Sequence, residues 1–119
     1  MAAMLAGRRD FVGVLLQAEY CQFEQNWEGA FGMYQSIFDQ LPSRSPPEQR
    51  QVLMGISRCM YEMGNYDGAI EIGQGAIEMN HHFPGVHKYI ALAQKAQGDH
   101  DGARATMTRA VLYETPTWD

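Results

Sequence analysis

Apolar residues recur every three or four positions along most of the chain, as they do in helices that bury one face. No stretch alternates apolar and polar residues in the manner of a β-strand. This pattern of apolar residues therefore predicts an all-α fold. The helical pattern covers six segments, at residues 10–25, 27–41, 46–63, 66–79, 84–97 and about 102–113.

Turn and cap residues separate the six segments. Gly64-Asn65 and Gly98-Asp99 are turn pairs, and Gln25-Asn26 breaks the first helical pattern. Pro42 is expected to end the second helix, because the residue before a proline is disfavoured in helical conformation. Residues 43–47 form the only linker-like stretch. At its end, Ser45-Pro46-Pro47-Glu48 predicts an N-cap, a proline at the first helical position and a capping-box glutamate.

A short motif recurs in phase and indicates an internal repeat. Asp67-Gly68-Ala69 is repeated 34 positions later as Asp101-Gly102-Ala103, and Glu28-Gly29-Ala30 precedes it by 39 positions. Self-similarity at such a period is typical of stacked helical units. Gly73 takes the place that Tyr34 and Met107 hold in the other copies, so we expect a neighbouring side chain to fill its space.

A 34-residue helix–turn–helix unit with small residues at its eighth and twentieth places resembles the tetratricopeptide repeat. The resemblance covers three units, at about 11–42, 50–83 and 84–116, within one domain of residues 1–119, with the linker at 43–47. The turn glycine of the fifteenth place is present as Gly64 and Gly98 but is Gln25 in the first unit. The small residues are Ala18, Ser57 and Ala91 at the eighth place and Ala30, Ala69 and Ala103 at the twentieth.

The resemblance implies a right-handed solenoid of three antiparallel helix pairs, whose first helices line a concave groove. Arg58, Lys88 and Lys95 then form a basic stripe with apolar neighbours, and an acidic peptide is its natural complement. The alternative is that these cations are ordinary solvated charges. The groove residues expected to contact a partner are Glu19, Met54, Arg58, Tyr61, Lys88, Leu92 and Lys95.

The function implied by the resemblance is a protein–protein interaction module or scaffold that binds a partner peptide. The family's best-known groove chemistry is a clamp for the C-terminal carboxylate of chaperones. None of its residues is matched here, and Glu19, at one clamp position, would repel a carboxylate. The alternative function is structural, as a segment of a longer helical array or a self-associating subunit. The positions that match the clamp are Leu15, Glu19, Gly55, Gly85 and Tyr89.

The last unit of a helical repeat needs a polar outer face or a cover. Its twenty-first place, which faces the next unit in this family, is Arg104, where the other copies have Phe31 and Ile70. Val111 nevertheless stays apolar, with Tyr113 and Trp118 beyond it. We expect this end face, made of Val111, Tyr113 and Trp118, to mediate self-association or to contact a continuing chain.

Charge, hydropathy and cysteine spacing narrow the classes of function and the cellular locations that remain for this chain. The net charge of −5 argues against nucleic-acid binding, which requires a basic face. No apolar run reaches the ~18–20 residues of a membrane span, and the chain is expected to be cytoplasmic. Cys21 and Cys59 lack metal-ligand spacing and are expected to be buried thiols in a reducing compartment.

Neither catalysis nor a cofactor is indicated. The chain has no phosphate-binding glycine loop and no nucleophile elbow, so no enzymatic activity is expected. His81, His82 and His87 are close in sequence and could hold zinc, but no cysteine or carboxylate completes a ligand set. An ordinary loop is the preferred interpretation, with His87 as a partly buried, hydrogen-bonded imidazole.

Overall fold

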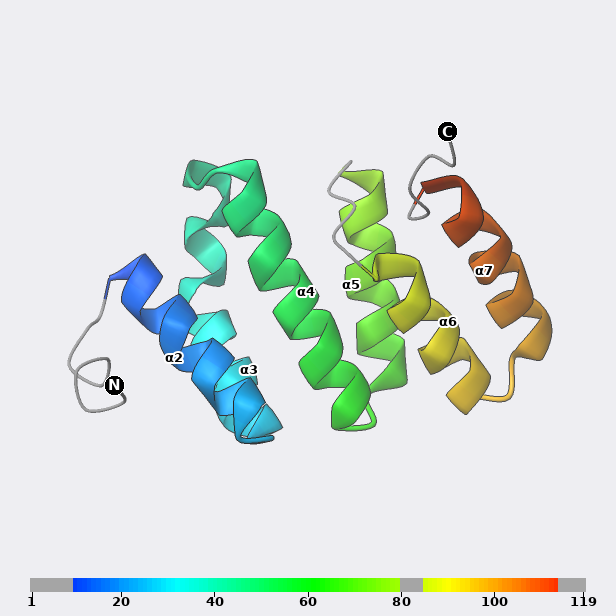
Figure 1. The fold of residues 1–119 in the computed structure, drawn as a ribbon, viewed down its shortest axis with the longest axis horizontal. Helices are drawn as coiled ribbons and strands as arrows, with labels where there is room; N and C mark the ends of the chain where they lie inside the picture. The colour runs from blue at the N-terminus through cyan, green and yellow to red at the C-terminus, as the bar shows by residue number, and fades with distance from the viewer. Residues whose placement is uncertain (1–9, 80–84, 114–119) are drawn as a thin grey trace.

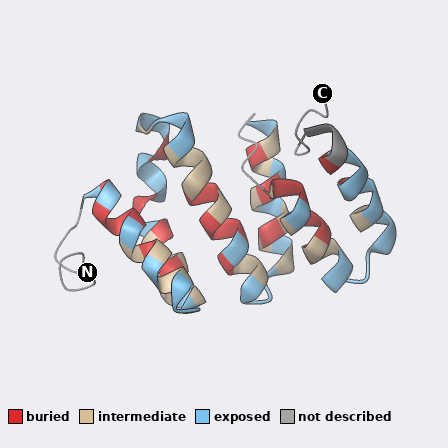
Figure 2. Ribbon diagram, in the orientation of Figure 1, coloured by how far each residue is buried: buried red, intermediate tan, exposed pale blue. Residues whose placement is uncertain are grey.

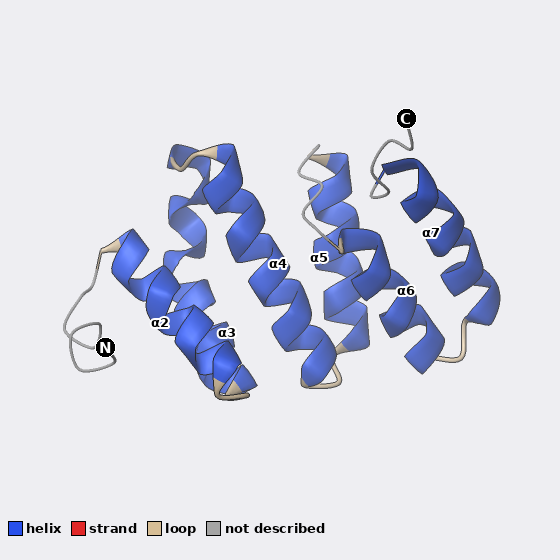
Figure 3. Ribbon diagram, in the orientation of Figure 1, coloured by secondary structure: helices blue, strands red, loops and turns tan. Residues whose placement is uncertain are grey.

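The computed structural model describes residues 10–79 and 85–113 (Figure 1). All regular elements in these ranges are helical (Figure 3), which confirms the all-α prediction. The elements are α2 (Phe11–Phe23), α3 (Trp27–Ile37), the 3₁₀ helix η1 (Phe38–Ser43), α4 (Pro46–Glu62), α5 (Tyr66–Glu78), α6 (Val86–Ala96) and α7 (His100–Tyr113).

The helices pack in sequential antiparallel pairs, α2 with α3, α4 with α5 and α6 with α7. Helix α4 also contacts α2 and α6, so these first helices of the three units form one layer (Figure 1). We call α2, α4 and α6 the first-helix layer. Helices α3 and α5 lie behind it, and each packs against the first helix of the next unit.

Each second helix begins with a capping side chain at the same place in its unit. Asn26 and Asn65 each accept a hydrogen bond from a backbone N–H three residues later, with N···O distances of 3.1 Å. Asp99 makes the same bond to Gly102 at 2.9 Å. A Cβ atom at Gly68 would lie 2.7 Å from the Asn65 side chain. The cap therefore explains why glycine recurs in the repeated motif.

The turn before each cap contains one residue with a left-handed backbone. The φ angles are +81° at Gly64, +85° at Gly98 and +61° at Gln25. The first unit thus keeps the turn geometry of the other two units although it lacks the glycine. Glutamine has a Cβ that crowds the backbone in this conformation, whereas glycine has none.

Replacing Gln25 with glycine is therefore expected to stabilise the fold by about 1 kcal/mol, because it relieves this crowding. Urea unfolding of the two proteins measures the difference. The matched control is Gly64→Gln, which should destabilise by a similar amount. A Gln25→Gly variant that is less stable than the parent would contradict the equivalence of the two turns.

The segment between the first two units differs from its prediction. Helix α3 ends at Ile37, before the predicted Leu41, and the chain continues as the 3₁₀ helix η1 through Pro42. Proline lacks the N–H that would bond to the carbonyl of Phe38 in an α-helix, so the chain tightens instead of continuing the α-helix. The prediction that the second helix runs to Leu41 and ends at Pro42 was therefore wrong, because α3 already ends at Ile37.

Residues 43–47 are held firmly by their neighbours. The Arg44 guanidinium lies 4.1 Å from the centroid of the Phe11 ring and 3.0 Å from a Glu48 carboxylate oxygen. Gln49 donates hydrogen bonds to the carbonyls of Leu41 and Arg44, at 2.6 and 3.0 Å. Arg44 thus connects this segment to both α2 and α4.

The predicted capping box at the start of α4 is confirmed. The Ser45 hydroxyl accepts from the Glu48 backbone N–H, and the Glu48 carboxylate accepts from the Ser45 backbone N–H at 3.2 Å. Hydrogen bonds from Arg44 and Ser45 hold the pKa of Glu48 below its usual value. The other boundaries agree within about two residues, with α7 beginning at His100, just after its Asp99 cap.

The buried residues are distributed along the packed helices (Figure 2). The small residues predicted at the helix crossings lie in the interior, since Ala18, Ser57, Ala30 and Ala69 are fully buried and Ala91 is nearly so. Small side chains allow the paired helices to approach closely. Ala103 is only half-buried, because it faces an open groove between α6 and α7.

Large and small residues alternate across the junctions between units. In the first junction the Tyr34 ring packs on Gly55, where an added Cβ would lie 2.6 Å from a ring carbon. In the second junction the small residue is on the other side. A Cβ at Gly73 would lie 2.6 Å from Cγ1 of Ile90. The prediction that a neighbour fills the space at Gly73 is confirmed.

Candidate functional site

The residues predicted to contact a partner all lie on the first-helix layer. Arg58, Lys88 and Lys95 are exposed, whereas Glu19, Met54, Tyr61 and Leu92 are half-buried. Their i, i+4, i+7 spacing places Met54, Arg58 and Tyr61 on one face of α4 and Lys88, Leu92 and Lys95 on one face of α6. Leu15, another position that the resemblance places in the groove, is buried in the core.

The α2 part of the layer is joined to α4 by side-chain hydrogen bonding. Gln51 of α4 donates to a carboxylate oxygen of Glu19 on α2. Glu19 is at the ninth place of the first unit, and Gln51 is at the second place of the second. This contact shows which places of consecutive units meet in the layer.

The α4 part of the layer is dominated by aromatic contacts. The Arg58 guanidinium lies 5.1 Å from the centroid of the half-buried Trp27 ring, within the range of a cation–π contact. The Tyr61 and Tyr66 rings lie 5.7 Å apart at an interplanar angle of 54°. These contacts restrain Arg58 and Tyr61 at the surface of the layer.

The α6 part of the layer borders a groove that sequence reasoning missed. We call this groove, between α6 and α7, the end groove; its volume is about 580 Å³. The structure thus places the two lysines and Leu92 beside α7, while Arg58 stays with Trp27. The end groove is lined by apolar Ala91, Leu92, Ala103 and Met107, by Thr108, and by Lys88, Lys95 and Arg104.

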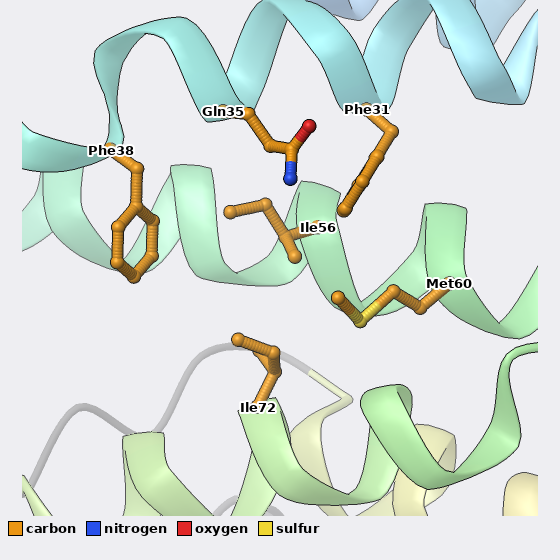
Figure 4. A pocket seen from close by; sticks show the side chains of 6 residues that line it. All are labelled: Phe31, Gln35, Phe38, Ile56, Met60 and Ile72. Atoms are coloured by element: carbon orange, nitrogen blue, oxygen red, sulfur yellow. The ribbon is translucent and has the colours of Figure 1, made fainter.

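Two further cavities lie where the first unit meets the second. The smaller, of about 250 Å³, is surrounded by Phe31, Gln35 and Phe38 on one side and by Ile56, Met60 and Ile72 on the other (Figure 4). The second, of about 380 Å³, lies at the end of α3 and also contacts Phe38. Phe31 and Phe38 thus face the second unit, which agrees with the place of Phe31 in the repeat.

The two thiols are poor nucleophiles at neutral pH. Burial is the main cause that raises the pKa of Cys59, to about 11. Burial, followed by the charge of Glu24, also raises the pKa of Cys21, which is only partly buried. The raised pKa values keep both thiols protonated at neutral pH. Because the thiolate is the reactive form, both are poor nucleophiles.

Neither metal ligands nor a membrane span were found in the described ranges. No three His, Cys, Asp or Glu side chains of residues 10–79 and 85–113 gather closely enough to hold a metal ion. No helix there is sufficiently long and apolar to cross a bilayer. His87, predicted to be partly buried, is fully buried. His81, His82 and Trp118 lie outside the described residues, and the side chains of Val111 and Tyr113 are not described.

Comparison with known families identifies the repeat. The family model described as tetratricopeptide repeat matches residues 89–113, which cover most of α6 and all of α7. The chain carries a tetratricopeptide repeat. The six α-helices of the described residues, packed in sequential antiparallel pairs, are consistent with three such repeats. No match was found among curated proteins or solved structures.

Tetratricopeptide repeats are protein–protein interaction modules and are generally not catalytic. The repeat therefore implies a protein–protein interaction module. Two surfaces are candidates for this binding. One is the face of the first-helix layer that carries the exposed cations, and the other is the end groove.

Proposed function

We propose that the first-helix layer binds an acidic segment of a partner protein. Arg58, Lys88 and Lys95 supply the positive charge, and Met54, Tyr61 and Leu92 offer apolar contacts beside them. The observation that carries this proposal is the exposure of Lys88 and Lys95 on a helix that contains no acidic residue.

The charge of α6 contrasts with that of the whole chain. The chain has 14 acidic and 9 basic residues, yet α6 contains its only two lysines and none of its acids. Within the described part of the chain, neither lysine forms a salt bridge. Positive potential on an otherwise acidic protein favours a negatively charged partner and speeds its approach.

The α2 end of the layer should receive a different part of the partner. Glu19 supplies a negative charge there, although Gln51 donates a hydrogen bond to it. Acidic residues of the partner are therefore expected over α4 and α6. A neutral or basic stretch fits the surface near Glu19.

Recognition of a C-terminal carboxylate is not expected. Two of the positions that match the family's clamp, Leu15 and Gly55, are buried, and neither has a side-chain donor. Glu19, at a third position, would repel a carboxylate. Peptides with a free or an amidated C-terminus should therefore bind equally well, because recognition uses internal acidic side chains.

Binding of an acidic peptide is expected to weaken steeply as salt rises, because exposed charges are screened over ~8 Å at physiological ionic strength. Fluorescence anisotropy with labelled peptides tests this. The peptides pair several acidic residues with an apolar anchor, and the matched controls replace each acid with its amide. An affinity that is the same for both sets, and flat with salt, would contradict the proposal.

A further inference from the structure

Helix α2 exposes an apolar stripe along one face. Val12, Leu16, Tyr20 and Phe23 are spaced by four, four and three residues, so they lie along the same side of the helix. Their exposed fractions run from 39% to 86%. Single exposed apolar residues are ordinary, but four on one helix face form a contiguous patch. We call these four residues the α2 stripe.

Two places of the α2 stripe are covered in the later units. Leu16 corresponds to Gly55 in the second unit, and Tyr34 of the preceding unit packs on Gly55. Tyr20 corresponds to Cys59 and Ala93, which are both fully buried. In the first unit these places are exposed because no unit precedes α2 among the described residues.

A junction between consecutive units has two halves. The α2 stripe corresponds to one half, and the end groove corresponds to the other. Met107 takes the place that Gly73 holds in the second unit, where Ile90 and Val86 of α6 pack against it. In the third unit no helix covers this place among the described residues, and Met107 is 47% exposed. The end groove is therefore the surface on which a further first helix would pack.

The internal contacts specify which residues would meet if α2 of another copy occupied the end groove. Tyr34 packs on Gly55. Met107 has the place of Tyr34 in its unit and Leu16 has the place of Gly55, so Met107 would meet Leu16. Glu19 accepts a hydrogen bond from Gln51, and the same correspondence predicts that Leu92 would meet Val12. Both equivalent pairs are apolar, so the junction would bury hydrophobic surface on both sides.

The charges of the two surfaces are complementary. Lys88, Lys95 and Arg104 border the end groove, and no acidic residue among those described lines it. Residues 10–24 contain three acids and neither lysine nor arginine. Opposite charge therefore favours α2 of a second copy over a basic helix in this groove.

We propose that copies of this chain associate head to tail, with the α2 stripe of one copy seated in the end groove of the next. The interface joins two different surfaces, so each added copy leaves one of each free, and the assembly grows as an open chain unless its ends meet in a ring. In this proposal Leu92 and Met107 mediate the association, and the role of Val111, Tyr113 and Trp118 stays a prediction.

Sedimentation velocity of the full chain, from micromolar to millimolar concentration, tests this proposal. The weight-average mass of the parent should rise with concentration beyond twice the monomer mass. Leu16→Glu and Met107→Glu should each remain monomeric, because each removes one of the two surfaces. Met79→Glu, at an exposed apolar residue outside both surfaces, is the matched control and should associate like the parent. Circular dichroism checks that every variant is folded.

Mixing the two variants distinguishes head-to-tail from symmetric association. Leu16→Glu keeps an intact end groove and Met107→Glu keeps an intact α2 stripe, so an equimolar mixture should stop at twice the monomer mass. A parent that stays monomeric throughout would overturn the proposal. So would a folded Met107→Glu variant that still self-associates alone. Neither Leu16 nor Met107 belongs to the proposed peptide contacts. Either result therefore leaves the proposal of acidic-peptide binding unaffected.

Discussion

Replacing Gly55 with alanine is expected to destabilise the fold by about 2 kcal/mol. The new Cβ would lie 2.6 Å from a ring carbon of Tyr34, which is 1% exposed and accepts a hydrogen bond from Gln22. A rigid buried ring cannot move aside, so α3 and α4 must separate. Overpacking of this kind costs about 1–3 kcal/mol, partly offset by the higher helix propensity of alanine.

The matched control for Gly55→Ala is Gly75→Ala. No heavy atom lies within 4 Å of a Cβ added at Gly75, so only the helix-propensity term remains. This variant should be more stable than the parent by about 1 kcal/mol. Urea unfolding of the three proteins gives the two differences. If both variants gain stability equally, the packing of Tyr34 on Gly55 described here is wrong.

Replacing Ala69 with leucine is expected to destabilise the fold by about 1–3 kcal/mol, because the enlarged side chain forces α4 and α5 apart. Ala69 is fully buried at the crossing of these helices. Ala103 has the same place in the third unit but faces the end groove. Ala103→Leu should therefore cost clearly less.

Thermal unfolding of the Ala69→Leu and Ala103→Leu variants compares the two positions directly. The expected order of stability is the parent first, then Ala103→Leu, then Ala69→Leu. Equal losses at both positions would show that the end groove is closed in solution. Equal stability of Ala69→Leu and the parent would disprove the repeat alignment.

The repeat and its helix crossings were predictable because they depend on local, recurring requirements. Small residues at two places, and the cap at the start of α4, follow directly from the spacing of residues in the sequence. The glycine of the repeated motif could also have been explained from sequence. Asn26, Asn65 and Asp99 stand three residues before it and are good capping residues.

Other features depend on three-dimensional packing and were missed. The course of the chain around Pro42 follows from Arg44 and Gln49, whose contacts with α2 and earlier carbonyls stabilise the 3₁₀ helix. The end groove arises where no further helix covers the third unit among the described residues. A signal was nevertheless present, since Met107 is large at a place where Gly73 receives a neighbouring helix.

The lysines of α6 lie on the border between the proposed peptide surface and the end groove. An acidic partner on the first-helix layer and α2 of a second copy would therefore use the same positive charge. We expect the two to weaken each other when both are present, because each partly neutralises Lys88 and Lys95.

Titration calorimetry with the best-binding acidic peptide tests the central proposal most directly, when the parent is compared with the double variant Arg58→Glu, Lys88→Glu. The control double variant, Arg104→Glu with Arg109→Glu, changes the net charge equally but lies on α7, outside the first-helix layer. The account predicts that the first variant binds about tenfold more weakly or worse, since two charge pairs are lost and replaced by repulsion. The control should bind like the parent. Equal binding by the parent and the Arg58→Glu, Lys88→Glu variant would contradict the account.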